Sequence, residues 1–285
     1  MTNISNIRKL GVGFSAEVNP FDPIYDRVER LENSHSFDYF GFSVGYNQSK
    51  HFREVYTPLL TRFPLLFHPV DLSICNSEPL DPSIITGIQN IVQLSETPWI
   101  TTDMAVWRVE GENLNASIIP TMLTKEAVTV VADRIREIGD SINVPFLPEN
   151  PPFWFSLGDL HILDFMAQVS DQADCYLCLD LGHLLSYQIC HGLVPDAGLA
   201  NFPLDRVVEV HVAGGVLWKN QTEEAYEDAH FAPIMPQTLD LLRLVLNRTS
   251  NLKAITLEAE GLAPEIIAGT LSQLRDISAP ILYTQ

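Results

Sequence analysis

Four histidines and five carboxylates follow short apolar runs that are spaced along the whole sequence. They are His68, Asp103, Glu149, Asp180, His183, His211, Asp228, His230 and Glu258. A charged side chain at the end of a buried strand costs much free energy unless it has a partner. Metal ions shared among these groups would supply that partner if the nine side chains meet at one edge of the fold. The pattern therefore predicts a cluster of two or three metal ions.

The residue types narrow the choice of metal. Imidazole and carboxylate ligands without thiolate suit zinc, iron or manganese, whereas structural zinc sites normally recruit cysteines. Five carboxylates carry more charge than one divalent ion neutralises. Sites of this type clamp a substrate oxygen, activate water or, with iron, activate dioxygen. Asn150 directly follows Glu149 and is a further candidate ligand through its carbonyl oxygen, although Asn-Pro is also ordinary turn chemistry.

Eight short apolar runs are the predicted strands that would position these side chains. They are 9–16, 37–44, 64–71, 99–106, 144–149, 175–183, 207–214 and 254–260. They do not alternate cleanly, as expected for parallel strands that are covered on both faces. Amphipathic stretches between them predict helices over 22–33, 52–62, 82–95, 124–139, 157–170, 236–248 and 264–275. The stretch 184–204 predicts a short helix and a loop.

Strands that alternate with helices in this way close most simply into a (β/α)8 TIM barrel, here a single domain over residues 1–285. An open doubly wound sheet is the alternative, but no G-x-G-x-x-G or P-loop accompanies an early strand. The functional face of a TIM barrel is the C-terminal end of its strands. The nine candidate side chains fall there, with Asp228 and His230 in a loop after the seventh strand. A lone histidine in an apolar strand is more often a hydrogen-bonded core residue, so the joint placement carries the prediction.

The charge balance and the cysteines limit the class of protein. Thirty-six acidic residues against 17 basic ones give a formal net charge of −19, which repels nucleic-acid phosphates and anionic membranes. We find no signal-peptide-like segment and no membrane span, and we expect a cytoplasmic protein with no nucleic-acid or membrane partner. Cys175 and Cys178 form a C-x-x-C within a predicted strand, where they point to opposite faces. They are therefore expected to be buried, reduced thiols.

Several local phrases resemble one known family. These are LPENPP at 147–152, LDLGH at 179–183, RVVEVHVAGG at 206–215, EDAHFAPI at 227–234 and TLEAEG at 256–261, with GVGF and FHPVDLSI nearer the start. They are similar to the multinuclear non-haem iron-dependent oxidative enzymes, the group of the methanobactin-biosynthesis oxidase and the thiaglutamate-pathway peptide-modifying enzyme. That group lies within the xylose-isomerase-like TIM barrels.

The resemblance implies two or three irons, dioxygen as co-substrate, and oxidative modification of a residue, usually cysteine, in a ribosomally made precursor peptide. It also implies a leader-binding partner protein. Carried over to this chain, the resemblance makes every candidate except Asp103 a metal ligand, with Asn150 as a further one. We expect Asp228, His230 and Glu258 to be the catalytic residues.

The chain also departs from the family pattern. Thr101, Thr102 and Asp103 stand where the family has Ser-Glu-His, so Asp103 would replace a histidine ligand. Gly215 stands where a family histidine closes the phrase HLAGH, and Glu260 only partly matches the acidic residue expected after Glu258. The number of occupied metal sites is therefore open.

Other functions of the same barrel superfamily are the alternatives. A sugar isomerase or epimerase fits the acidic composition, whereas an endonuclease IV-like hydrolase normally needs a basic face for duplex DNA. A peptide-binding module without activity is a third hypothesis, which the retention of nearly every ligand position disfavours.

Overall fold

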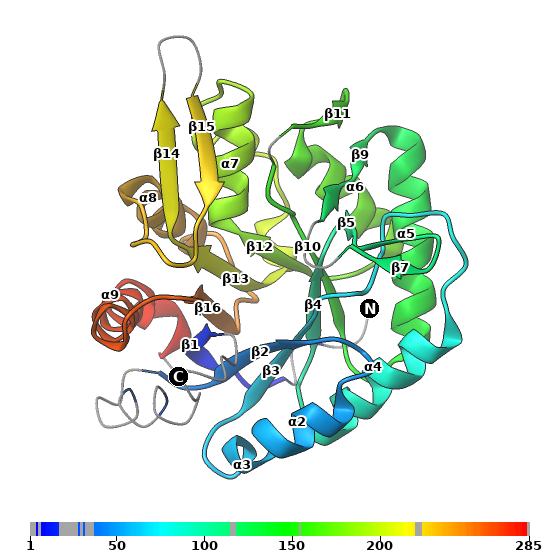
Figure 1. Ribbon diagram of the computed structural model, residues 1–285. Coiled ribbons are helices and arrows are strands. Elements are labelled where there is room, and N and C mark those ends of the chain that lie inside the picture. The colour runs from blue at the N-terminus through cyan, green and yellow to red at the C-terminus, as the bar shows by residue number, and fades with distance from the viewer. Residues whose placement is uncertain are drawn as a thin grey trace.

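Eight parallel strands close into one barrel in the computed structural model, as the sequence predicts (Figure 1). The strands are β1 (Gly11–Ser15), β2 (Phe40–Val44), β3 (Leu65–Pro69), β4 (Ile100–Asp103), β10 (Phe146–Glu149), β12 (Leu177–Asp180), β13 (Val207–Ala213) and β16 (Ala254–Glu258). They follow one another around the barrel in chain order, and β16 pairs with β1 to close it. The structure describes residues 4, 7–16, 28, 31, 37–114, 118–153, 155–219 and 224–283.

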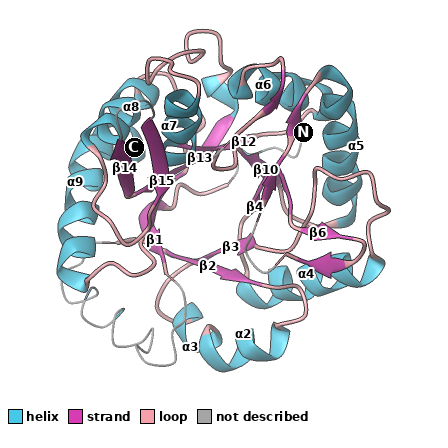
Figure 2. Ribbon diagram, turned by 45° about the horizontal axis from the view of Figure 1, so that its top comes forward, coloured by secondary structure: helices cyan, strands magenta, loops and turns pink. Residues whose placement is uncertain are grey.

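Helices surround the barrel and cover the outer face of its strands (Figure 2). They are α2 (Ser49–Val55), α3 (Thr57–Leu60), α4 (Pro82–Ser95), α5 (Lys125–Ser141), α6 (Ile162–Ala173), α7 (Leu181–Cys190), α8 (Pro236–Leu246) and α9 (Pro264–Leu282). Every residue of β13 is buried, which explains why the apolar runs do not alternate. Among the described residues, no helix combines the length and apolarity that crossing a membrane requires.

Local signals in the sequence set two of the helix starts. The Asp81 side chain accepts the backbone N–H of Ser83 at 2.8 Å at the start of α4, and Pro82 occupies the first turn. The Thr124 hydroxyl accepts the N–H of Ala127 at 3.2 Å at the start of α5. Both helices begin where the sequence predicts.

Several predicted helices have different bounds, and α9 continues to Leu282 although it was predicted to end at 275. The helix predicted over 52–62 is divided into α2 and α3, because Pro58 has no N–H for continuing a helix and instead lies in the first turn of α3. The helix predicted over 157–170 begins only at Ile162, since His161 is its N-cap and 157–158 form the short strand β11 (Leu157–Gly158). The helix predicted over 22–33 lies outside the described residues except for two positions.

The sixth strand is shorter than predicted. We expected a strand over 175–183, but β12 ends at Asp180, and Asp180 is the N-cap of α7. Its Oδ1 accepts the N–H of His183 at 2.5 Å, so the chain turns into a helix directly after the strand. His183 therefore lies in the first turn of a helix, which still starts at the barrel mouth.

Short two-stranded pieces rise above the C-terminal end of the barrel, of which β9 (Met122–Leu123) with β11 is parallel and the others are antiparallel. The hairpin of β14 (Gly215–Lys219) and β15 (Glu224–Asp228) stands on one side of the mouth in Figure 1, and β9 and β11 stand on the other. Two small pairs, β5 (Ala105–Val106) with β8 (Ile119–Pro120) and β6 (Arg108–Val109) with β7 (Glu112–Asn113), follow β4. Where we predicted a loop carrying Asp228, the structure has a strand that pairs Asp228 with Gly215 and so returns it to the mouth.

The two cysteines of the C-x-x-C lie on opposite faces, as predicted. Cys175 packs in the apolar layer between strands and helices, whereas Cys178 packs in a separate cluster with Tyr39, Trp99 and Leu147. Neither cysteine forms a disulfide.

Candidate metal centre

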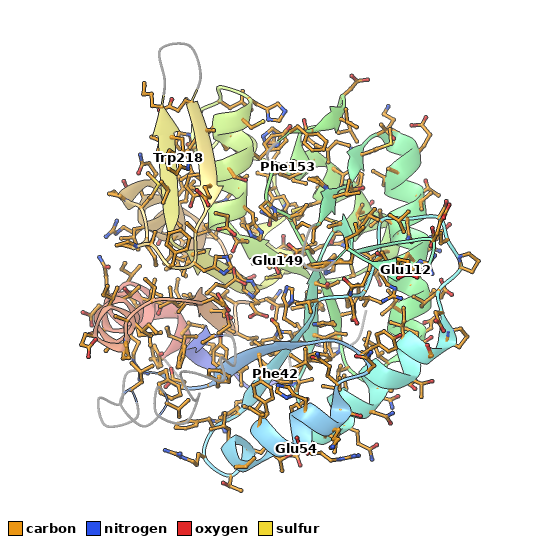
Figure 3. All side chains as sticks on the ribbon, viewed as in Figure 1. Phe42, Glu54, Glu112, Glu149, Phe153 and Trp218 are labelled. Atoms are coloured by element: carbon orange, nitrogen blue, oxygen red, sulfur yellow. The ribbon has the colours of Figure 1, made fainter. Side chains whose placement is uncertain are left out.

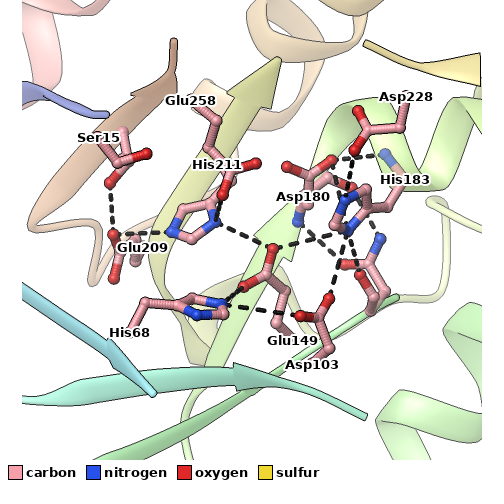
Figure 4. Close-up of polar contacts among 12 residues, drawn as sticks. Ser15, His68, Asp103, Glu149, Asp180, His183, Glu209, His211, Asp228 and Glu258 are labelled. Atoms are coloured by element: carbon pink, nitrogen blue, oxygen red, sulfur yellow. Dashed lines mark hydrogen bonds and ion pairs between the residues drawn. The ribbon is translucent and has the colours of Figure 1, made fainter. Parts of the chain in front are cut away.

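The nine predicted histidines and carboxylates converge at the barrel mouth, and Figure 4 labels all of them except His230. Six of them come from the C-terminal ends of six strands, namely His68 (β3), Asp103 (β4), Glu149 (β10), Asp180 (β12), His211 (β13) and Glu258 (β16). The register aligns them, since Glu149 pairs with Asp103 and Asp180 pairs with His211 in neighbouring strands. His183 from α7, and Asp228 with His230 from the end of the β14–β15 hairpin, complete the set.

Glu149 occupies the centre of this group, near the middle of the barrel in Figure 3. Its Oε1 lies 3.0 Å from His211 Nδ1 and 3.7 Å from His183 Nδ1. Its Oε2 lies 3.3 Å from His68 Nε2. Asp103 faces two of the same rings, 3.8 Å from His68 Nε2 and 3.7 Å from His183 Nδ1. One carboxylate thus joins histidines from three separate elements.

The side of the group that faces solvent is built around Asp228. Its Oδ2 lies 3.2 Å from His183 Nε2 and 2.8 Å from His230 Nε2. Glu258 bridges the remaining gap, with 3.5 Å from one oxygen to His211 Nδ1 and 3.5 Å from the other to His230 Nε2. These contacts link the solvent-facing residues to the buried ones around Glu149.

Many polar atoms of this group are buried without a hydrogen-bond partner. In the part of the chain that the structure describes, ten buried side-chain nitrogens and oxygens lack one, and eight of them belong to the predicted site. These are His68 Nδ1, Asp103 Oδ1, both Glu149 oxygens, Asp180 Oδ2, His211 Nδ1, Asp228 Oδ1 and Glu258 Oε2. Even the 3.0 Å contact between Glu149 and His211 lacks hydrogen-bond geometry. Such atoms normally cost free energy unless a cation satisfies them, so the arrangement suits metal ligation.

Ligand atoms also cluster tightly enough to share ions. The combinations Asp103–Glu149–His183, Asp180–His183–Glu258 and His183–Asp228–His230 each have ligand atoms within 4.8 Å of one another. A further combination joins Glu149 and His211 with the thiol of Cys178, whose pKa burial raises well above its usual value. A thiol therefore lies within reach of the site, which the sequence analysis did not anticipate.

Burial and mutual charge shift the pKa values of these groups strongly. Burial raises the pKa of Asp103 to about 6 and that of Glu258 to about 8. Burial also opposes ionisation of Glu149, but His211 and His68 outweigh it and hold the pKa of Glu149 well below its usual range. For His183 burial lowers the pKa, and Asp180 with Asp228 raises it well above 6.5. The metal-free site therefore retains protons, which a metal ion would displace on binding.

Asn150 supports the end of β12. Its side-chain Nδ2 donates to the carbonyl of Asp180 at 2.8 Å, and its Oδ1 accepts the N–H of Asp180 at 3.0 Å. Its backbone carbonyl lies 2.7 Å from His183 Nδ1. The side chain thus fixes Asp180, and the prediction that Asn150 also ligates a metal stays a prediction.

Two carboxylates of the site were missed as site residues. Glu209 lies below the cluster, where its Oε1 is 2.9 Å from His211 Nε2 and its Oε2 accepts Trp99 Nε1–H at 2.7 Å. The Thr256 hydroxyl donates to the same Oε1 at 2.5 Å. Glu209 is two positions before His211 in a strand, and side chains two apart share a face, so the strand period could have revealed it. A carboxylate on Nε2 leaves Nδ1 of His211 to face the cluster.

Glu260 is the second missed residue. Its Oε2 lies 2.6 Å from His230 Nδ1, and Ser15 donates to its other oxygen at 3.1 Å. The bond to Glu260 turns His230 Nε2 towards Asp228. The signal was the spacing of two from Glu258, which we noted only as a partial match to the family.

A cavity of about 800 Å³ opens above the cluster. His68, Asp103, Glu149 and Glu258 form part of its floor, and apolar side chains that include Trp107, Phe155 and Phe231 line its walls. A volume of this size accommodates a short stretch of an extended molecule. The candidate ligands are therefore accessible to a substrate.

Comparison with solved structures defines the class of fold. The chain superposes on a xylose isomerase-like TIM barrel protein from Mycobacterium smegmatis, solved in complex with magnesium, with a TM-score of 0.60, 11% identity and coverage of 99% of this chain and 100% of that one. A xylose isomerase domain-containing protein from Salmonella typhimurium gives a TM-score of 0.53 at 13% identity, covering 98% and 99% of the two chains. The protein thus shares the fold of these xylose isomerase-like TIM barrels.

Comparison of sequences defines the family. Residues 28–279 match the RiPP precursor modification enzymes MbnB/TglH/ChrH, and the chain belongs to this family of enzymes that modify ribosomally made peptides. Relatives include a UPF0276 protein of Neisseria meningitidis serogroup C, 28% identical over 211 residues that span 73% of this chain and 74% of the relative. A UPF0276 protein of Caulobacter vibrioides is 26% identical over 214 residues, covering 74% and 71%.

Proposed function

We propose that this protein is a multinuclear non-haem iron enzyme that uses dioxygen to modify a residue, most simply a cysteine, of a ribosomally made precursor peptide. The observation that carries the proposal is the set of eight buried, unpartnered nitrogens and oxygens at the barrel mouth. The membership in a family of peptide-modifying enzymes supplies the substrate class. A leader-binding partner protein that delivers the peptide is part of the proposal.

The donor set fits iron. Imidazole nitrogens and carboxylate oxygens are ligands that non-haem iron accepts, and a site of several carboxylates needs more than one divalent ion for charge balance. We assign two or three irons to the overlapping groups that share Glu149 and His183. Bound iron would supply Lewis acidity and one-electron chemistry with dioxygen. Asp103 stands in this set as an anionic ligand at the position where the family pattern has histidine.

The chain's own residues divide into a buried and a solvent-facing group. The side chain of Glu149 is only 1% exposed, whereas those of Asp228, Glu258 and His230 are 12%, 14% and 26% exposed. The last three line the cavity, so an entering peptide side chain meets them first. We therefore assign the catalytic roles to Asp228, His230 and Glu258, and a ligand role deep in the site to Glu149.

Hydrogen bonds hold the catalytic side chains in position. Asp228 Oδ2 accepts from both His183 Nε2 and His230 Nε2, which orients the two rings towards each other. Glu260 fixes the far side of the His230 ring through Nδ1. The ring therefore presents Nε2 to the cavity in one orientation, and in the metal-free site a proton at that nitrogen lies between Asp228 and Glu258.

The test is anaerobic purification with metal analysis, followed by oxygen uptake with a cysteine-containing precursor peptide encoded beside this gene. We expect bound iron in a ratio of two or three per chain, oxygen consumption that depends on the peptide, and a mass change in the peptide. The E149Q variant is the control, because it removes the central ligand and should lose both iron and uptake. A fully folded wild-type protein that binds no iron under these conditions contradicts the proposal.

A further inference from the structure

The walls of the cavity above the cluster are apolar. Val70, Trp107, Ile118, Pro152, Phe155 and Phe231 contribute to them. Phe155 and Phe231 are 50% and 61% exposed, and no other phenylalanine in the described part of the chain is exposed to this degree. Large aromatic side chains that stay exposed around a cavity mark a surface that another apolar group covers.

The cavity also lacks a lysine or arginine side chain among the described residues. Its titratable lining residues are all histidines and acids, and no lysine or arginine lines it within the described residues. A substrate that carries a carboxylate or phosphate would therefore find no lysine or arginine to pair with, and it would face acidic groups at close range.

Metal ions do not reverse this balance. Seven carboxylates surround the site, namely Asp103, Glu149, Asp180, Glu209, Asp228, Glu258 and Glu260. Three ferrous ions would supply about six positive charges, and histidine ligands are neutral, so about one negative charge remains. Even the loaded floor offers no surplus of positive charge for an anionic substrate.

From these observations we infer that the cavity selects a peptide segment in which apolar residues flank the reacting residue and acidic residues are absent. The flanking side chains pack on Phe155 and Phe231, which reach the cavity from the segments after β10 and β15. The inference rests on the proposed function in one respect, namely that a peptide residue enters this cavity.

Binding without turnover tests the inference. The protein is loaded with zinc, which has no redox chemistry, and titrated with three blocked pentapeptides, acetyl-Gly-X-Cys-X-Gly-amide, in which X is Leu, Gln or Glu. The cysteine is common to all three, so thiolate binding to the metal cancels and the differences report the flanking residues. Isothermal titration calorimetry at low ionic strength gives the dissociation constants.

We expect the order Leu, Gln, Glu from the tightest to the weakest, with about a tenfold difference between Leu and Gln from apolar burial. Phe155→Ala and Phe231→Ala should each weaken the Leu peptide by about fivefold and leave the Gln peptide within about twofold. Leu244→Ala is the control, because Leu244 is a 38% exposed residue of α8 that does not line the cavity, and it should bind all three peptides as the wild type does.

Three results would overturn the inference. They are a Glu peptide that binds as tightly as the Leu peptide, an unchanged Leu preference in both phenylalanine variants, and no measurable binding of the Leu peptide. A failure of the iron and dioxygen chemistry leaves the order of the three peptides intact, so the two proposals fail separately.

Discussion

Two glutamates in the barrel interior are equally buried but differ in whether protein groups donate hydrogen bonds to them. Glu149 and Glu209 are each 1% exposed and belong to strands β10 and β13. Glu209 is satisfied by protein groups, since it accepts from Trp99, His211 and Thr256. Neither oxygen of Glu149 has a hydrogen-bond partner. Burial alone therefore does not mark a ligand, whereas a deficit of protein donors does.

The two glutamates are connected through His211. Its Nε2 lies 2.9 Å from Glu209 and its Nδ1 lies 3.0 Å from Glu149. The Glu209 carboxylate thus fixes the His211 ring that faces Glu149, an arrangement that recurs around metal-bound histidines. We interpret the layer that contains Glu209 as a rigid support and the layer that contains Glu149 as the metal-binding surface.

The largest effect is expected from removing the central ligand. Wild-type protein with metal at about a thousandfold excess over the dissociation constant should gain about 4 kcal/mol in free energy of unfolding. Glu149→Gln should lose metal affinity by more than about 100-fold, so most of this gain should vanish. Denaturant unfolding with and without metal measures it. Equal metal-induced stabilisation in variant and wild type would show that Glu149 is not a ligand.

A smaller effect is expected in the supporting layer. Glu209→Gln places an amide N–H2 among three donors, so at least one buried donor loses its acceptor. We expect a loss of about 2–3 kcal/mol from the metal-free protein and a 10- to 100-fold loss of metal affinity. Chemical denaturation and competition with a chelator give the two values. Unchanged metal affinity in a folded variant would contradict the supporting role.

The pH dependence separates the metal-free from the loaded protein. The pKa values of Glu258 and Asp103 are raised to about 8 and about 6 from 4.5 and 3.8, so the folded state binds more protons than the unfolded state between about pH 4 and 8. The stability of the metal-free protein should therefore fall as pH rises through this window. The lowered pKa values of Glu149 and Asp228 affect stability only below about pH 4, so they do not reverse the trend between about pH 4 and 8.

Metal binding should show the opposite slope, because the metal displaces these protons. Thermal melts between pH 5 and 8, with a chelator and with metal, are therefore expected to diverge as pH rises. Metal-free melting temperatures that increase over this window would contradict the assignment of the raised pKa values.

The smallest effect is expected from Thr256→Val. The Thr256 hydroxyl bonds to Glu209 at 2.5 Å and to Tyr39 at 2.7 Å, and it makes no hydrogen bond to the His211 ring. Removing it should cost about 1 kcal/mol of stability and change metal affinity by less than about threefold. If chelator competition shows a loss of metal affinity as large as that of Glu209→Gln, the whole hydrogen-bond network around Glu209 sets the metal affinity. The bond from Glu209 to His211 alone would then not explain it.

The sequence predicts the barrel well because its physical signal is strong. Buried parallel strands need continuous apolar runs, and all eight predicted runs contain a barrel strand. The parallel arrangement then brings the strand ends to one face, so the six side chains on barrel strands could be placed together from their spacing. Asp180 shows the limit, because one residue ends a strand and caps a helix, and an apolar run does not reveal that change.

Other features depend on contacts that the sequence does not display. The β14–β15 hairpin is held by pairing across the loop, so the sequence alone places Asp228 in a plain loop. Glu209 lies within the apolar run VVEVHV, where a single acid resembles an exposed position unless the inward face is already known. The unpartnered state of Glu149 depends on the orientation of every neighbouring donor, which only the folded structure gives.

The assignment of the unpartnered atoms around Glu149 as metal ligands underlies the proposed function. Its most direct test is a crystal structure of the protein loaded with ferrous iron under anaerobic conditions, with anomalous scattering recorded at the iron edge. We predict anomalous peaks about 2.0–2.2 Å from oxygens of Glu149 and from the facing histidine nitrogens. An anomalous map without peaks at the barrel mouth, in which Glu149 makes direct hydrogen bonds to the histidines, would contradict the account.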